Sequence, residues 1–108
     1  MKWLTTIAAI CLTSICFGQI EVLHFNASFN AANACEWVND LTDCDIAFVD
    51  ILAQPDLQKK HKIVVVPTII VLNNGEEEKR FQANIMMQME ATKKEVQNSI
   101  DEIVMEAF

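Results

Sequence analysis

The chain has 108 residues, of which 52% are hydrophobic, and its formal net charge is −7 at pH 7. This length favours a single compact domain, and the apolar fraction is sufficient for one core. The excess of acidic over basic residues argues against nucleic acid as a partner, because phosphate contacts require a basic face.

Residues 1–18 have the pattern of a secretory signal peptide. A short basic start precedes the uncharged run Trp3–Phe17, and the small residues Cys16 and Gly18 occupy the positions that an A-x-A-like cleavage site needs. The run is shorter than the roughly 20 residues of a membrane-spanning helix. We expect cleavage after Gly18, a secreted or periplasmic product, and no stable membrane anchor after cleavage. A retained N-terminal anchor is the alternative.

The first half of the remaining domain, residues 19–108, alternates predicted strands and helices. Ile20–Phe25 and Ile46–Ile51 are short apolar runs that contain β-branched residues, which predicts two strands. Apolar residues at helical spacing predict one helix between them, beginning near Asn30 and capped by Ser28 or Asn30. The residues that carry this spacing are Ala31, Ala34, Cys35, Val38 and Leu41.

The second half contains a hairpin between two further helices. Pro55 suits the first turn of a short helix. The most apolar run, Ile63–Leu72, contains Pro67, which lacks an amide donor, so the third strand should begin at Pro67 or Thr68. Asn74-Gly75 predicts a tight turn into the return strand Glu77–Gln82.

A capping box, Thr92-Lys93-Lys94-Glu95, opens a final amphipathic helix. The whole pattern predicts an α/β domain with a four-stranded mixed sheet and helices on both faces. Its element order is β-α-β-α-β-β-α.

Three motifs in this order resemble the thioredoxin-like family. They are the strand end Phe25-Asn26-Ala27-Ser28-Phe29, the segment Val66-Pro67-Thr68 and the hairpin that follows it. The resemblance extends from Ile20 to about Ile103, without the N-terminal βα unit that is usual in the family. It implies a cis-proline at Pro67 and a Cys-x-x-Cys pair at positions 30 and 33. This chain has Asn30-Ala31-Ala32-Asn33 there instead.

The missing cysteines change the function that the resemblance implies. Disulfide exchange requires a thiolate, which an amide cannot supply. The buried acid of the family is replaced by His24. We therefore expect a domain without catalytic residues, cofactor or metal. It would bind an unknown peptide or protein in a groove with free backbone groups. The groove residues are Phe29, Val66, Pro67 and Thr68.

Alternative interpretations remain for the polar residues and the cysteines. Asn30 and Asn33 act either as a cap and a solvated turn or as hydrogen-bond donors in the groove. His24 is either a satisfied core histidine or a partner of Asn33. Cys35 and Cys44 define the alternative function, a thiol-disulfide oxidoreductase, but they also suit a structural disulfide. Cys35 alone suits apolar packing.

The methionines at positions 86, 87 and 89 have two interpretations. Thioethers are suitable Cu(I) ligands, so they could form a metal site. The other interpretation is that they extend an apolar surface formed with Phe29 and Pro67, and such a surface often marks a binding site. A scaffold role without any binding in the groove is a further possibility.

Overall fold

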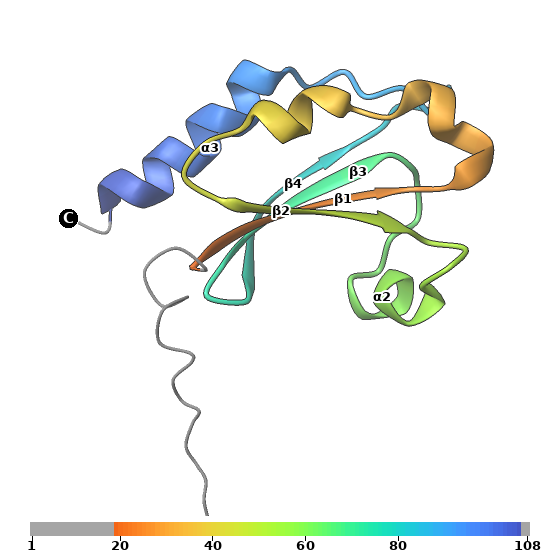
Figure 1. Ribbon diagram of the computed structural model, residues 1–108, viewed down its shortest axis with the longest axis horizontal. Helices are drawn as coiled ribbons and strands as arrows, with labels where there is room; N and C mark the ends of the chain where they lie inside the picture. Colours follow the sequence, from red (N-terminus) through yellow and green to blue (C-terminus); the bar gives the residue numbers. More distant parts are fainter. Residues whose placement is uncertain (1–18, 107–108) are drawn as a thin grey trace, which may run out of the picture.

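The computed structural model describes residues 19–106, so the predicted signal peptide lies outside the described residues. A four-stranded sheet forms the centre of the domain, in the order β2-β1-β3-β4 (Figure 1). β1 pairs in parallel with β2 and antiparallel with β3, and β3 pairs antiparallel with β4. The predicted mixed sheet is therefore correct. The strands are β1 (Ile20–Asn26), β2 (Asp45–Asp50), β3 (Thr68–Asn73) and β4 (Glu76–Gln82).

Both faces of the sheet carry a core, because apolar residues occupy both alternating sets of positions in the central strands. Val22 and Ile69 pack on the face covered by α3 (Lys93–Glu106). Phe25 and Ile70 pack on the opposite face, which holds α2 (Pro55–Lys60). Figure 1 shows these helices on opposite sides of the sheet, as the sequence predicted.

The prediction of one helix between the first two strands was wrong. Two short 3-10 helices take its place, η2 (Ser28–Asn33) and η3 (Glu36–Asp40). The residue before η2 is Ala27, and no side chain caps that end, so the predicted cap at Ser28 or Asn30 is wrong. The apolar side of the segment still faces the core, since Cys35, Val38 and Leu41 are buried.

Local signals in the second half of the chain were accurate. Asn74 and Gly75 have φ angles of 54° and 86°, which a tight hairpin turn requires. The Glu95 amide donates to Thr92 Oγ1, and the Thr92 amide donates to Glu95 Oε1, which is the predicted capping box. Within residues 19–106, no helix has the length and apolarity needed to cross a membrane.

Candidate functional site

Asn30 joins three segments at the end of the sheet where β1 ends. Its Nδ2 lies 3.2 Å from Asn26 Oδ1, 3.4 Å from the Val66 carbonyl and 3.2 Å from the Met87 carbonyl. Its Oδ1 accepts from Asn33 Nδ2 at 2.8 Å. Asn30 is only 5% exposed, so it is neither a cap nor part of a solvated turn. It fixes η2 against the two loops that precede β3 and α3.

The proline segment is less open than the sequence predicted. The Val66–Pro67 peptide bond is cis. Val66, Pro67 and Thr68 are all buried. The Val66 carbonyl faces Asn30, and the Pro67 carbonyl accepts from the amide of Ala83. The expectation of a free backbone edge is therefore wrong for both carbonyls, because other segments of the chain already bond them. The Val66 amide has no partner among the described residues.

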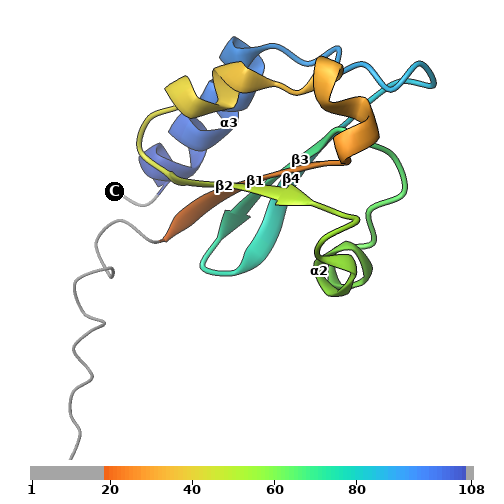
Figure 2. The same cartoon turned by 45° about the vertical axis from the view of Figure 1, so that its right-hand side comes forward.

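Exposed apolar side chains surround this end of the molecule. Phe29 is 67% exposed, Met86 67% and Met87 39%, and Ile85 is almost fully exposed. The Asn30–Met87 hydrogen bond brings η2 next to the loop that carries these residues. Figure 2 shows η2 and this loop at the same end of the sheet. We call Phe29, Ile85, Met86 and Met87 the apolar rim.

Two residues expected at this surface are placed elsewhere. Pro67 is fully buried and does not contribute to the rim. Met89 packs against the core that α3 covers. The three methionines therefore do not converge as copper ligands would. Among the described residues, no group of three or more His, Cys, Asp or Glu side chains is arranged to hold a metal ion.

His24 lies on β1 beneath the junction between η2 and η3. Its Nε2 accepts a hydrogen bond from the backbone amide of Cys35 at 3.0 Å, rather than from Asn33 as one interpretation suggested. The ring is 1% exposed, and burial lowers the pKa of His24. The His24 ring is therefore a neutral imidazole near pH 7. Its role here is to bond the amide at the point where the helical segment is interrupted.

The two cysteines of the domain are free thiols in environments that oppose thiolate formation. Burial raises the pKa of the Cys35 thiol, which packs in the core beside Val38. Burial, together with the carboxylates of Asp45 and Asp43, raises the pKa of Cys44 to about 11. A nucleophilic cysteine needs a lowered pKa and access to its substrate. Neither thiol meets the first of these requirements.

Sequence reasoning missed two contributors to this end of the molecule. Asn26 donates its amide to the Asn30 carbonyl and is 9% exposed. The signal was present, because Asn26 is a polar residue directly after the strand predicted from Ile20 to Phe25. The contribution of Met87 is its backbone carbonyl, which no side-chain pattern reveals.

Comparison with known proteins agrees with this architecture. No protein-family model matches the chain, and no curated relative matches it. Thioredoxin 1 from Thermosipho africanus TCF52B aligns with a TM-score of 0.64 at 24% identity, covering 81% of this chain and 97% of its own. Thioredoxin from Schistosoma mansoni aligns with a TM-score of 0.63 at 19% identity, covering 86% and 84%.

A point mutant of thioredoxin from Halobacterium salinarum NRC-1 aligns with a TM-score of 0.61 at 17% identity, covering 91% and 84%. These likenesses extend over most of both chains, so this protein has a thioredoxin-like fold. Identities this low establish the fold alone, and the activity must be argued from the residues of this chain.

Proposed function

We propose that this protein is an exported, redox-inactive thioredoxin-like domain that binds a peptide or protein partner beside the Val66–Pro67 turn. The observation that carries the proposal is the apolar rim, which lies beside the buried side chain of Asn30. Exposed apolar groups that gather on one surface are typical of binding sites. The methionines in the rim suit partners of varied shape, since their side chains adapt to different contacts.

The hydrogen bonds of Asn30 support a pre-organised surface. They hold η2, the proline segment and the loop of Met87 in one arrangement before any partner arrives. Pre-organisation lowers the entropy cost of binding. The buried Val66 carbonyl limits strand pairing at the turn, so side-chain contacts with the rim should supply most of the affinity. The Val66 amide remains available to a peptide carbonyl.

The redox-inactive part of the proposal is tested by the reduction of insulin with dithiothreitol as the electron source. We expect no rate above the uncatalysed reaction, because the thiols of Cys35 and Cys44 have raised pKa values. A measurable rate that disappears in Cys35→Ser would establish the oxidoreductase alternative instead.

The binding part is tested with peptides selected from a displayed random library and measured by fluorescence anisotropy. Phe29→Ser combined with Met86→Ser should weaken the selected peptides by about tenfold or more, since buried apolar anchors dominate such interfaces. Met105→Ser is the matched control, because Met105 is 74% exposed but lies on α3. Equal binding by the wild type and the Phe29/Met86 variant would reject the rim as the site.

A further inference from the structure

The strand β2 forms one outer edge of the sheet (Figure 1). An edge strand has one row of backbone amides and carbonyls that no neighbouring strand bonds. Its pairing with β1 shows which residues carry this row. Asn26 is aligned with Asp50, and the Asn26 carbonyl accepts from the amide of Ile51 at 2.9 Å. Because successive residues of a strand direct their backbone groups to alternate sides, those of Ile46 and Phe48 point outward. No described residue outside the sheet bonds them.

The two edges of the sheet differ in how they are protected. Residues 76–80 of β4 are all charged, and the pairing of β4 with β3 is irregular between Val71 and Leu72. Charged side chains and bulges are common means of preventing a further strand from pairing at an edge. By contrast, β2 pairs with β1 in unbroken register, and its residues 46–49 carry no charge. The β2 edge therefore has the properties of a site for strand addition.

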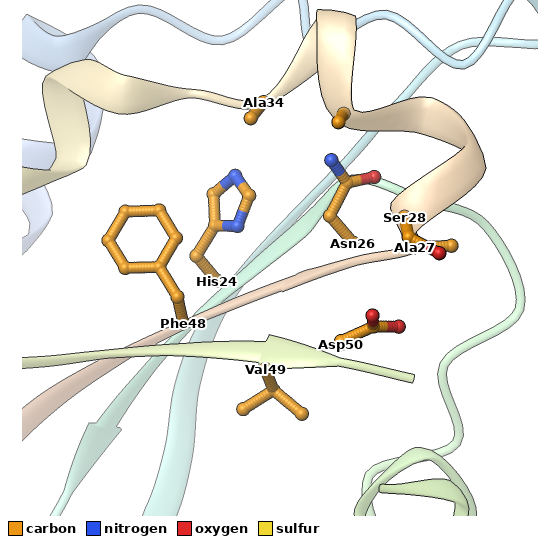
Figure 3. A pocket seen from close by; sticks show the side chains of 9 residues that line it. His24, Asn26, Ala27, Ser28, Ala34, Phe48, Val49 and Asp50 are labelled. Atoms are coloured by element: carbon orange, nitrogen blue, oxygen red, sulfur yellow. The ribbon is translucent and has the colours of Figure 1, made fainter. Parts of the chain in front are cut away.

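The side chains of β2 indicate what can lie beside this edge. Figure 3 shows the Phe48 side chain on the same side of the sheet as His24, and the Val49 side chain on the opposite side. Phe48 is 46% exposed, and with Ala31 and Ala34 of the segment above it lines a hollow of about 260 Å³. An apolar side chain of an added strand therefore has room to contact the Phe48 ring on this side.

The other side of β2, where Val49 packs in the core beside α2, is acidic at its first residue. Asp45 is aligned with Glu21 of β1, so two carboxylates occupy neighbouring positions on the same face of the sheet. Neither forms an ion pair with a described residue. Asp43 and Asp50 place further negative charge before β2 and at its end. Since opposite charges on neighbouring strands stabilise a sheet, this edge favours a basic strand.

We propose that β2 binds a basic, extended segment of a partner protein as a fifth strand of the sheet. The backbone groups of Ile46 and Phe48 bond the added strand. Its apolar side chains contact Phe48, and its alternate, basic side chains face Asp45 and Glu21. A second copy of this chain is disfavoured, because each copy has a net charge of −7 and brings the same acidic residues. The proposal does not rest on the proposed function, since β2 contains no residue of the apolar rim.

The test measures hydrogen exchange in the ¹⁵N-labelled protein at pH 7, with the peptide acetyl-KVKVKVK-amide as the probe. In the free protein, we expect rapid exchange at the amides of Ile46 and Phe48 and slow exchange at those of Ala47 and Val49, which point toward β1. The peptide should slow exchange at Ile46 and Phe48 by about tenfold or more, with a Kd on the order of 100 μM. The acidic peptide acetyl-EVEVEVE-amide should bind at least about tenfold more weakly.

N-methylation of the basic peptide tests the backbone pairing separately from the charge. In an extended peptide, the valine amides and the lysine amides point to opposite sides, so only one set faces β2. One peptide is methylated at its valine amides and the other at its lysine amides, and both keep the net charge. One of the two should lose at least about tenfold in affinity, whereas the other should bind like the unmodified peptide.

Two variants of the protein test the side-chain contacts. Asp45→Asn should weaken the basic peptide by about threefold, because it removes one carboxylate beside the added strand. Phe48→Ala should weaken it by about fivefold, because it removes the apolar contact. Glu78→Gln makes the same charge change as Asp45→Asn on the other edge strand, β4, and should leave the affinity unchanged.

Four results would overturn the proposal. The first three are unchanged exchange at Ile46 and Phe48 with the peptide, equal binding of the acidic peptide, and no difference between the two methylated peptides. The fourth is slow exchange at Ile46 and Phe48 in the free protein, because the edge would then already be covered. A dependence of that protection on protein concentration would identify a second copy as the occupant, and its absence would identify another segment of the same chain.

Discussion

At the scale of single residues, the buried side chain of Asn30 has a structural role at the end of β1. Its amide nitrogen has two hydrogens and lies within hydrogen-bond distance of three oxygens, of which the Val66 carbonyl is the farthest at 3.4 Å. The partners Val66 and Met87 are 36 and 57 residues away along the chain. A single buried amide therefore couples η2 to two distant loops.

Removal of this amide should destabilise the domain. We expect Asn30→Ala to lower the free energy of unfolding by about 2 to 3 kcal/mol, because it leaves the Asn26 amide oxygen, the buried Val66 carbonyl and the part-buried Met87 carbonyl without this donor. Urea denaturation followed by circular dichroism measures the change. Asn39→Ala makes the same chemical change at an exposed residue of η3 and should cost less than about 0.5 kcal/mol. Equal losses in the two variants would show that the Asn30 amide contributes nothing specific.

The reactivity of Cys44 tests the electrostatics beside the second strand. Its pKa of about 11 predicts slow alkylation by iodoacetamide at pH 8, with a rate that rises with pH until it levels off above that value. Asp45→Asn removes one of the carboxylates that raise the pKa. It should therefore increase the rate at pH 8 by roughly two- to fourfold.

Peptide mapping by mass spectrometry assigns each alkylation rate to its cysteine. Asp56→Asn, in α2 on the other face of the sheet, is the control and should leave the rate of Cys44 unchanged. A rate that already levels off near pH 8.5 would contradict the raised pKa.

The roles of His24 and Asn30 could not be predicted from the sequence because their partners are fixed by tertiary structure. Both residues lie at or next to the end of β1. The bond from the Cys35 amide to His24 depends on the interruption of the helix above β1. An asparagine near a predicted helix start suggested a cap, since that is its common local role. Burial by two distant loops gave Asn30 a different role here.

At the scale of elements, the spacing of apolar residues between β1 and β2 predicted one helix where the structure has two 3-10 helices. The buried residues Cys35, Val38 and Leu41 recur at intervals of three, which fits the three residues per turn of a 3-10 helix as well as an α-helical face. The extended backbone at Ala34 then separates η2 from η3. By contrast, the hairpin and the final helix were predictable because Asn74-Gly75 and the Thr92–Glu95 box act locally.

The capping box gives a prediction for α3. Thr92→Ala should lower the free energy of unfolding by about 1 kcal/mol, because the Glu95 amide loses its acceptor at Thr92 Oγ1. Thr92→Ser retains that hydroxyl and should remain within about 0.5 kcal/mol of the wild type. Thermal and urea denaturation of the three proteins measure the difference. A loss in the serine variant as large as in the alanine variant would indicate that the threonine methyl, and not the hydrogen bond, stabilises this end.

At the scale of the whole molecule, the two-sided core follows directly from the strand sequences. β1 and β3 carry apolar residues on both faces, so each face requires a cover of its own. His24 is the exception on its face, a buried titratable group in a row of apolar side chains. The stability of the entire domain should therefore depend on its protonation.

This dependence gives a pH prediction with a definite sign. The folded-state pKa of His24 lies below its ordinary value of 6.5, because burial disfavours the charged ring. The unfolded chain therefore takes up a proton at a higher pH than the folded chain. The stabilisation is fully present above about pH 6.5 and is lost as the pH falls toward the folded pKa, by at most about 1.4 kcal/mol per pH unit for this group. Urea denaturation between pH 7.5 and 5 measures the slope.

In this experiment the contribution of His61 to the pH dependence must be distinguished from that of His24. Burial, followed by the charges of Lys60 and Arg80, also lowers the pKa of His61, so both histidines act in the same direction. His61 is more exposed than His24, and we expect His61→Gln to retain most of the slope. Imidazole NMR signals of the folded protein then assign each pKa directly. A His24 ring that titrates at or above 6.5 in the folded protein would contradict a neutral histidine held beneath the interrupted helix, because protonation of Nε2 would break its bond from the Cys35 amide.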